Sequence, residues 1–242
     1  MLGKWILRLL AMSYVTAILA ESALKLTLVV TLWAVPLNAI FGVLCAMWIV
    51  RRPTKTTAVV SAFVDLPLAL SPVVVGLALL LLYGRGGWFG DYLIEHGHQI
   101  AFATPGIVLA TIFVSLPFVV REVVPVLREI GNEQEQAAWT LGASSFATFR
   151  RITFPAIRPA LVYGIVLTAA RCLGEFGAVS VISGRIEGQT QTLTLYVQDR
   201  FDTFDLTGAY ATSVLLAAIA IATLVLANLR KPASRRQGEA TP

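Results

Sequence analysis

Long apolar runs separated by short basic segments constrain this chain more than any other feature of its sequence. At about 20 residues or more, each run is long enough to cross a hydrocarbon core of about 30 Å as a helix. The runs lack the alternating pattern of a membrane barrel strand. The sequence therefore predicts an all-α integral membrane protein, a polytopic helical bundle, and excludes a soluble enzyme. The five runs cover residues 26–50, 62–83, 105–124, 160–182 and 208–229.

The composition agrees with this prediction. Hydrophobic residues make up 57% of the chain and charged residues only 14%, whereas soluble domains carry about 25% charged residues. The net charge of +5 lies beside the apolar runs rather than on a separate basic face, which argues against a nucleic-acid partner. Cys45 and Cys172 both lie inside apolar runs and show neither disulfide nor metal-site spacing.

Basic residues divide the connecting segments between the two sides of the membrane. Segments 51–61 and 125–159 and the polar tail 231–242 are rich in Lys and Arg, which predicts that they lie in the cytoplasm together with the C-terminus. Segments 84–104 and 183–207 are expected outside, where they either contact an external partner or form ordinary loops anchored by aromatic residues. The basic residues expected on the outer side are few: Lys25, Arg85, Arg185 and Arg200.

The first 23 residues form a separate case. They are apolar but short for a span, and Arg8 interrupts them. We expect a short membrane or interfacial helix that ends in a turn near Glu21 and adds a sixth helix at the N-terminus. The segment lacks the A-x-A site that would precede Glu21 in a cleaved signal peptide.

The connection 132–159 is the most informative cytoplasmic segment. Asn132 is expected to cap a short helix, with Glu135 returning to the cap as in a capping box. Gly142 permits a turn, after which a second short helix is expected to end at Pro155. Small and apolar residues give the first helix a close-packing face: Ala137, Ala138 and Leu141.

These residues resemble the EAA loop of ABC-importer permeases. The resemblance implies that the loop is a coupling helix that sits in a groove of a separate ATPase subunit. The leading acidic residue of that motif is Gln136 here, and Glu135 precedes it. The residues to which the resemblance assigns ATPase coupling are Glu135, Gln136, Ala137, Ala138, Leu141, Gly142, Ala143 and Pro155.

Residues 24–230 as a whole resemble the permeases of oxyanion ABC importers, and most of all the CysW-type sulfate/thiosulfate permeases. Molybdate permeases share a similar Gly-Glu-Phe-Gly segment. The resemblance implies a type I ABC-importer fold: a permease domain 24–230, with its coupling loop at 132–155. The segments that carry it are 65–67 (DLP), 71–74 (SPVV), 171–184 (RCLGEFGAVSVISG) and 190–196 (TQTLTLY).

The resemblance also implies the partners. They are a second permease subunit of the CysT type, a dimer of ATPase subunits of the CysA type and an external sulfate-binding protein. The complex would lie in the bacterial inner membrane, with ATP and Mg²⁺ bound at the ATPase and no cofactor bound by this chain.

Two charged residues are expected within the fourth run. Arg171 and Glu175 lie four apart and would share one helix face. An ionised residue at bilayer depth costs about 2.5–3.5 kcal/mol on insertion scales. The pair therefore either locks helix packing or lies beside a translocation path, with Ser71 and Ser180 as further path candidates. Asp65 is expected to pair with Arg121 or with another subunit.

No catalytic or metal-binding motif accompanies these features. The sequence contains no G-x-x-x-x-G-K-[ST] run, and His96 and His98 have no other ligand candidates nearby. Carrying two negative charges inward against 100 mV costs roughly 4.6 kcal/mol. A sulfate importer therefore needs a source of energy, and because this chain has no nucleotide-binding motif, we expect that source on another chain. The hypothesis is a non-catalytic permease subunit for sulfate or thiosulfate. A molybdate or tungstate permease and a non-transporting assembly subunit are the alternatives.

Overall fold

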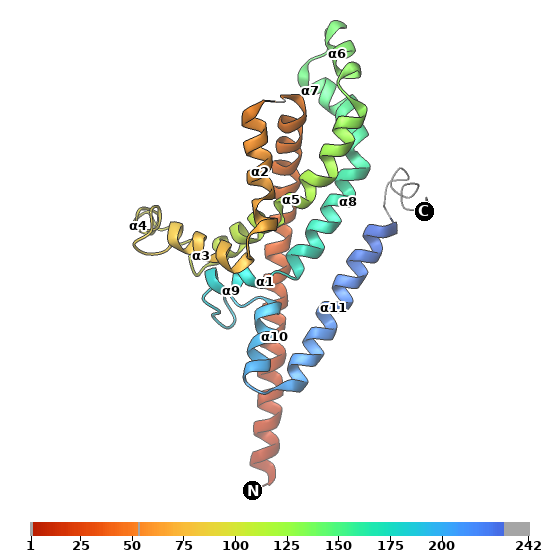
Figure 1. The fold of residues 1–242 in the computed structure, drawn as a ribbon. Helices are drawn as coiled ribbons and strands as arrows, with labels where there is room; N and C mark the ends of the chain where they lie inside the picture. Colours follow the sequence, from red (N-terminus) through yellow and green to blue (C-terminus); the bar gives the residue numbers. More distant parts are fainter. Residues whose placement is uncertain (1, 53, 230–242) are drawn as a thin grey trace. The chain divides into compact units, whose positions relative to one another are not determined.

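The computed structural model describes residues 2–52 and 54–229, with side chains for residues 20–52 and 54–225. All regular structure in these ranges is helical. The expected tail 231–242 and the side chain of Arg8 lie outside the described residues. The helices, labelled in Figure 1 where there is room, are α1 (Leu2–Arg51), α2 (Lys55–Ala69), α3 (Pro72–Tyr83), α4 (Gly90–Glu95), α5 (Thr104–Ile130), α6 (Glu133–Thr140), α7 (Ser145–Thr148), the π-helix η1 (Phe149–Thr153), α8 (Phe154–Leu173), α9 (Gly177–Ile182), α10 (Leu193–Asp202) and α11 (Leu206–Leu229).

The membrane-spanning prediction is confirmed within the described residues. Four helical stretches are long and apolar enough to cross a membrane, or up to five if the broken pair α2 and α3 counts as one span. The polytopic all-α class predicted from the apolar runs therefore holds. The four unbroken stretches are Ala20–Arg51, Thr104–Ile130, Ser145–Leu173 and Leu206–Val225.

The expected turn near Glu21 is wrong. Helix α1 runs without a break from Leu2 to Arg51, so residues 2–23 do not form a separate short helix. Residues 4–35 contain neither Gly nor Pro, which removes the usual helix breakers. The Glu21 carboxylate lies 2.6 Å from the Lys25 ammonium group, a spacing that supports a continuous helix.

Two of the expected spans are interrupted. The run 62–83 is broken at Leu70 and Ser71, whose backbones are extended, because the ring of Pro72 disfavours helical backbone at the preceding residue. The run 160–182 is broken after Leu173, where α8 ends, and α9 begins only at Gly177. Irregular backbone at membrane depth is tolerated where protein or a cavity surrounds it.

The chain divides into two compact units. The first comprises Met1–Ala34, Ser71–Thr111 and Cys172–Ala220. One part of its core joins α1, α5, α9 and α10, and the backbone N–H of Leu193 donates to Thr27 Oγ1 at 2.9 Å. The members of this cluster are Val30, Ile107, Val179 and Leu195.

Helices α3 and α9 of this first unit pack closely because glycines remove the side chains between them. A Cβ atom on Gly76 would lie 2.5 Å from the carbonyl oxygen of Ala178, and one on Gly177 would lie 2.8 Å from Pro72 Cβ. The two helices that follow the broken positions therefore meet.

The second unit comprises Val35–Leu70, Ile112–Arg171 and Ile221–Pro242. Its helices are joined by a buried hydrogen bond from Asn38 Nδ2 to Ser115 Oγ at 2.7 Å. The expected pairing of Asp65 with Arg121 is confirmed, since Arg121 Nε donates to Asp65 Oδ1 at 3.0 Å. Its core joins α1, α2, α5 and α8 through Val43, Ala46, Ile49, Val64, Val119, Val120, Val123, Leu127, Ile157 and Leu161.

Candidate functional site

The segment 132–155, here called the coupling loop, has the predicted helix–turn–helix form. Helix α6 is followed by Gly142, whose φ of +82° lies in the left-handed region that glycine adopts without steric cost. Ser144 then caps α7, and its hydroxyl accepts the Ala147 N–H at 3.3 Å. Helices α6 and α7 lie next to each other near the start of α8 (Figure 1).

Two details of the predicted loop are wrong. Asn132 precedes α6 as its N-cap residue but makes no side-chain cap hydrogen bond, so the expected capping box is not formed. Pro155 does not end a helix, because the helical stretch Ser145–Leu173 continues through it. Proline would clash with the carbonyl four residues earlier in an α-helix, and the π-helical turn η1 immediately before it changes that spacing.

The Glu135 side chain faces the protein interior. Glu135 is 5% exposed, and its carboxylate accepts hydrogen bonds from Arg51 Nη2 and Thr153 Oγ1. Arg51 Nη1 also donates to the carbonyl of Gly131 at 2.9 Å. Sequence reasoning used Arg51 only as a marker of membrane orientation and missed Thr153, because both partners are distant in sequence from Glu135.

The other residues predicted for ATPase coupling are exposed or half-buried. Gln136, Ala137 and Pro155 are exposed, and Ala138 and Ala143 are half-buried. Leu141 was predicted to belong to a close-packing face, and it is 88% exposed. Large apolar side chains exposed on a protein surface can mark interaction sites. The loop therefore presents an apolar surface made by Trp139, Leu141 and Phe146.

The four candidate path residues do not form one cluster on one helix. Arg171 lies in the last turn of α8, and Glu175 lies in the break after it, so the prediction that they share a helix face is wrong. Ser71 is an exposed N-cap residue of α3 without a side-chain cap bond. Ser180 Oγ donates to the Gly177 carbonyl at 2.8 Å within α9.

Glu175 holds the break between α8 and α9 in place. It is 3% exposed, and its Oε1 accepts the Ala178 N–H at 2.9 Å. Its own carbonyl accepts the Thr194 hydroxyl at 2.7 Å. The carboxylate lines a cavity of about 10 Å³, which is the size needed for about one water molecule. In this conformation the cavity is too small for a tetrahedral oxyanion.

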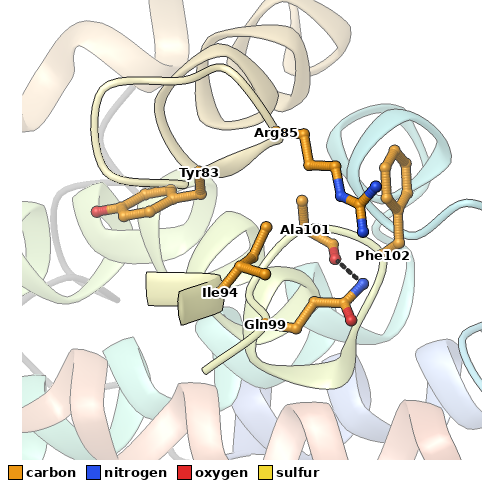
Figure 2. A pocket seen from close by; sticks show the side chains of 6 residues that line it. All are labelled: Tyr83, Arg85, Ile94, Gln99, Ala101 and Phe102. Atoms are coloured by element: carbon orange, nitrogen blue, oxygen red, sulfur yellow. Dashed lines mark hydrogen bonds between the residues drawn. The ribbon is translucent and has the colours of Figure 1, made fainter. Parts of the chain in front are cut away.

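A larger pocket of about 300 Å³ lies in the segment predicted to be external (Figure 2). Figure 2 shows the Arg85 side chain extending toward Phe102, while Gln99 Nε2 donates to the Ala101 carbonyl at 3.1 Å. Phe102 has a φ of +59°, which is uncommon for a residue with a Cβ. Sequence reasoning counted Arg85 only as an outer cation.

In the other segment expected outside, Tyr196 packs on Arg200, whose guanidinium carbon lies 4.8 Å from the ring centroid. Burial raises the pKa of the Tyr196 phenol above its ordinary value, and Arg200 opposes this shift. His96 Nδ1 lies 2.7 Å from the Tyr92 carbonyl oxygen. Among the residues that the structure describes, no group of three or more His, Cys, Asp or Glu side chains could hold a metal ion.

Comparisons with known proteins identify the family. The sulfate transport system permease protein CysW of Synechococcus elongatus is 48% identical over 217 residues, covering 90% of this chain and 76% of that protein. CysW of Escherichia coli is 47% identical over 207 residues, covering 86% and 71%.

The fold is also that of a solved ABC transporter. A bacterial transporter involved in the import of the acidic polysaccharide alginate matches with a TM-score of 0.70 and 20% identity, covering 89% of this chain and 79% of that one. Residues 38–235 match the family described as binding-protein-dependent transport system inner membrane component. The chain therefore belongs to this family of transport system inner membrane components.

Proposed function

We propose that this chain is the membrane-spanning subunit of an ATP-driven importer that carries sulfate into the cell. The observation that carries the proposal is the 48% identity to a sulfate transport permease over 90% of the chain. The resemblance of segments 65–74 and 171–184 to oxyanion permeases supports the same substrate class. Thiosulfate, another tetrahedral dianion, is proposed as a second substrate.

The chain itself is the non-catalytic subunit. The proposed source of energy for transport is a pair of separate ATPase subunits of the CysA type, which would bind ATP and Mg²⁺. The exposed apolar surface of Trp139, Leu141 and Phe146 gives such a partner a docking site, because burial of apolar surface drives protein association. ATPase closure would then move the coupling loop and switch the helices between outward-open and inward-open states.

The proposed complex contains a second permease subunit of the CysT type and an external sulfate-binding protein. We place the complex in the bacterial inner membrane, with the coupling loop and the C-terminus in the cytoplasm, because basic residues concentrate in those segments. Residues 24–230 would form the permease domain, followed by the cytoplasmic tail 231–242.

The proposed translocation path runs past the two broken helices. Discontinuous helices are the places where transporters build substrate sites, and here the helices after the breaks meet at Gly76 and Gly177. Ser71, Ser180 and Glu175 lie at or just beyond these breaks. Arg171 supplies a guanidinium group, which suits a tetrahedral oxyanion. The small cavity beside Glu175 would have to widen during transport.

Reconstitution tests the proposal. The chain is co-expressed with a CysT-type permease and a CysA-type ATPase, and the complex is placed in proteoliposomes with a sulfate-binding protein. We expect ATP-dependent uptake of radiolabelled sulfate, reduced by unlabelled thiosulfate. Uptake of molybdate that excess sulfate does not reduce would indicate a molybdate permease instead. An assembled complex that transports neither anion would indicate an assembly subunit.

A further inference from the structure

We infer that Arg51, the last residue of α1, is a positioning residue that transmits the movement of the coupling loop to the first membrane helix. The inference deepens the proposed function, because it names the contact through which ATPase movement would enter the membrane domain. It rests on three contacts within the second unit, made by Arg51, Glu135 and Thr153.

The first observation concerns which residue of α6 is buried against the rest of the second unit. Glu135 is the buried residue of this helix, and its seven companions in α6 are exposed or half-buried. Its carboxylate accepts from Arg51 and Thr153. A force applied to the exposed surface of α6 therefore reaches the membrane helices through this carboxylate, besides the chain connections at either end and the contacts of α6 with α7 and η1.

The second observation concerns the geometry at Arg51. One terminal nitrogen bonds Glu135 and the other donates to the Gly131 carbonyl at 2.9 Å, so the guanidinium holds α6 at its first turn and also just before its start. The planar fork of arginine suits such a two-point contact, which the point charge of lysine cannot reproduce. The contact is largely shielded, with 17% and 7% of the two side chains exposed, so water screens it weakly.

The third observation concerns which membrane helices the Glu135 contacts join to the loop. Thr153 is the last residue of η1, which leads directly into α8, and Arg51 ends α1. The carboxylate of Glu135 therefore connects the loop to two spans, one through the threonine hydroxyl and one through the guanidinium. The covalent chain already joins the loop to α5 and to α8. Helix α1 has no such covalent link to the loop. Besides the packing of Phe149 against the core of the second unit, Arg51 supplies its hydrogen-bonded connection to the loop.

The test uses the reconstituted complex of the chain with its ATPase, second permease and sulfate-binding protein. Three quantities are measured: the amount of ATPase that co-purifies, the ATP hydrolysed and the sulfate taken up. In R51Q, R51K and E135Q we expect normal co-purification and continued ATP hydrolysis. Sulfate uptake per ATP should fall about tenfold, within the usual range of coupling between sites. The neighbouring exposed residue supplies the control R52Q, which removes the same charge and should leave this ratio unchanged.

The charge-swapped double variant R51E/E135R distinguishes a role of the ion pair in transmitting loop movement from a purely structural role. Recovery of uptake per ATP in the double variant, relative to R51Q, supports the inference. Normal coupling in R51Q overturns it. Loss of ATPase co-purification in R51Q, R51K and the double variant alike also overturns it, since the pair would then be a structural brace. A wild-type complex that hydrolyses ATP without importing sulfate would instead refute the proposed function.

Discussion

At the scale of single residues, close packing depends on positions where a methyl group has no room. Gly42 of α1 faces Val119 of α5, and a Cβ atom there would lie 2.6 Å from Val119 Cγ1. Val119 is fully buried and its side chain is stiff at χ1, so the backbone would have to shift. We expect Gly42→Ala to destabilise the protein by about 1–3 kcal/mol, seen as a lower Tm in detergent.

A double variant checks the physical reason for this loss. In Gly42→Ala combined with Val119→Ala, the smaller side chain at position 119 makes room for the new methyl group. The loss of stability should then be less than the sum of the two single losses, because contacting residues are not additive. Strict additivity would contradict the proposed clash.

A second prediction at this scale concerns Glu175. Its carboxylate caps the start of α9 through the Ala178 N–H, and removing a cap of this kind costs about 1 kcal/mol. Glu175→Ala should therefore lower the Tm and reduce sulfate uptake, since the break lies on the proposed path. Glu187, an exposed acidic residue of the same unit, supplies the control Glu187→Ala. Equal Tm values for the two variants would count against the capping role.

At the scale of elements, the coupling loop depends on one backbone conformation. Gly142 has a φ of +82° and open space around it, so Gly142→Ala introduces no clash and costs only the left-handed backbone, about 1–2 kcal/mol. We expect weaker binding of the ATPase subunit, measured by co-purification. Gly188 has a φ of +74° and equally open surroundings in the segment expected outside. Gly188→Ala should leave ATPase binding intact, and a similar loss in both variants would argue against a local effect.

A separate prediction concerns the apolar surface of the coupling loop. Leu141 is 88% exposed, so Leu141→Ser removes little buried area from the isolated chain and should leave its Tm unchanged. The same change should weaken ATPase binding, since a docked leucine would lose its apolar contact. Trp88, 86% exposed on the segment expected outside, gives the matched control Trp88→Ser. Unchanged co-purification in Leu141→Ser would exclude this residue from the docking surface.

Element boundaries were predictable where a local residue imposes them. The turn at Gly142 follows from the residue at that position and was predicted correctly. Pro155 was misread as a helix end, because the π-helical turn that accommodates it depends on how the whole stretch Ser145–Leu173 winds. The turn expected near Glu21 was wrong because the change of hydropathy there does not interrupt helical hydrogen bonding.

At the scale of the whole molecule, the proposed function predicts how transport responds to voltage. Sulfate carries two negative charges, so moving it inward against 100 mV costs roughly 4.6 kcal/mol. We expect proteoliposomes to accumulate sulfate against an inside-negative potential when ATP is supplied. An ATPase variant unable to hydrolyse ATP is the control and should abolish accumulation. Accumulation driven by an inside-positive potential without ATP would indicate a passive pore.

The fold class could be predicted from local properties of the sequence. The length and spacing of the apolar runs predict membrane helices, because every backbone group in lipid must bond within its own segment or barrel. Basic flanking segments and the coupling-loop motif then narrowed the class to an importer permease, and the family match agrees with it. Each of these signals lies within one continuous stretch of sequence.

The roles of individual polar groups depended on three-dimensional packing. Glu135 was predicted to return to its own helix cap, yet its partners Arg51 and Thr153 lie 84 and 18 residues away in sequence. Arg171 and Glu175 were expected to share a helix face, and a helix end separates them. Hydrogen bonds of this kind form only after several helices have packed, so their partners are set by the arrangement of helices and not by sequence spacing.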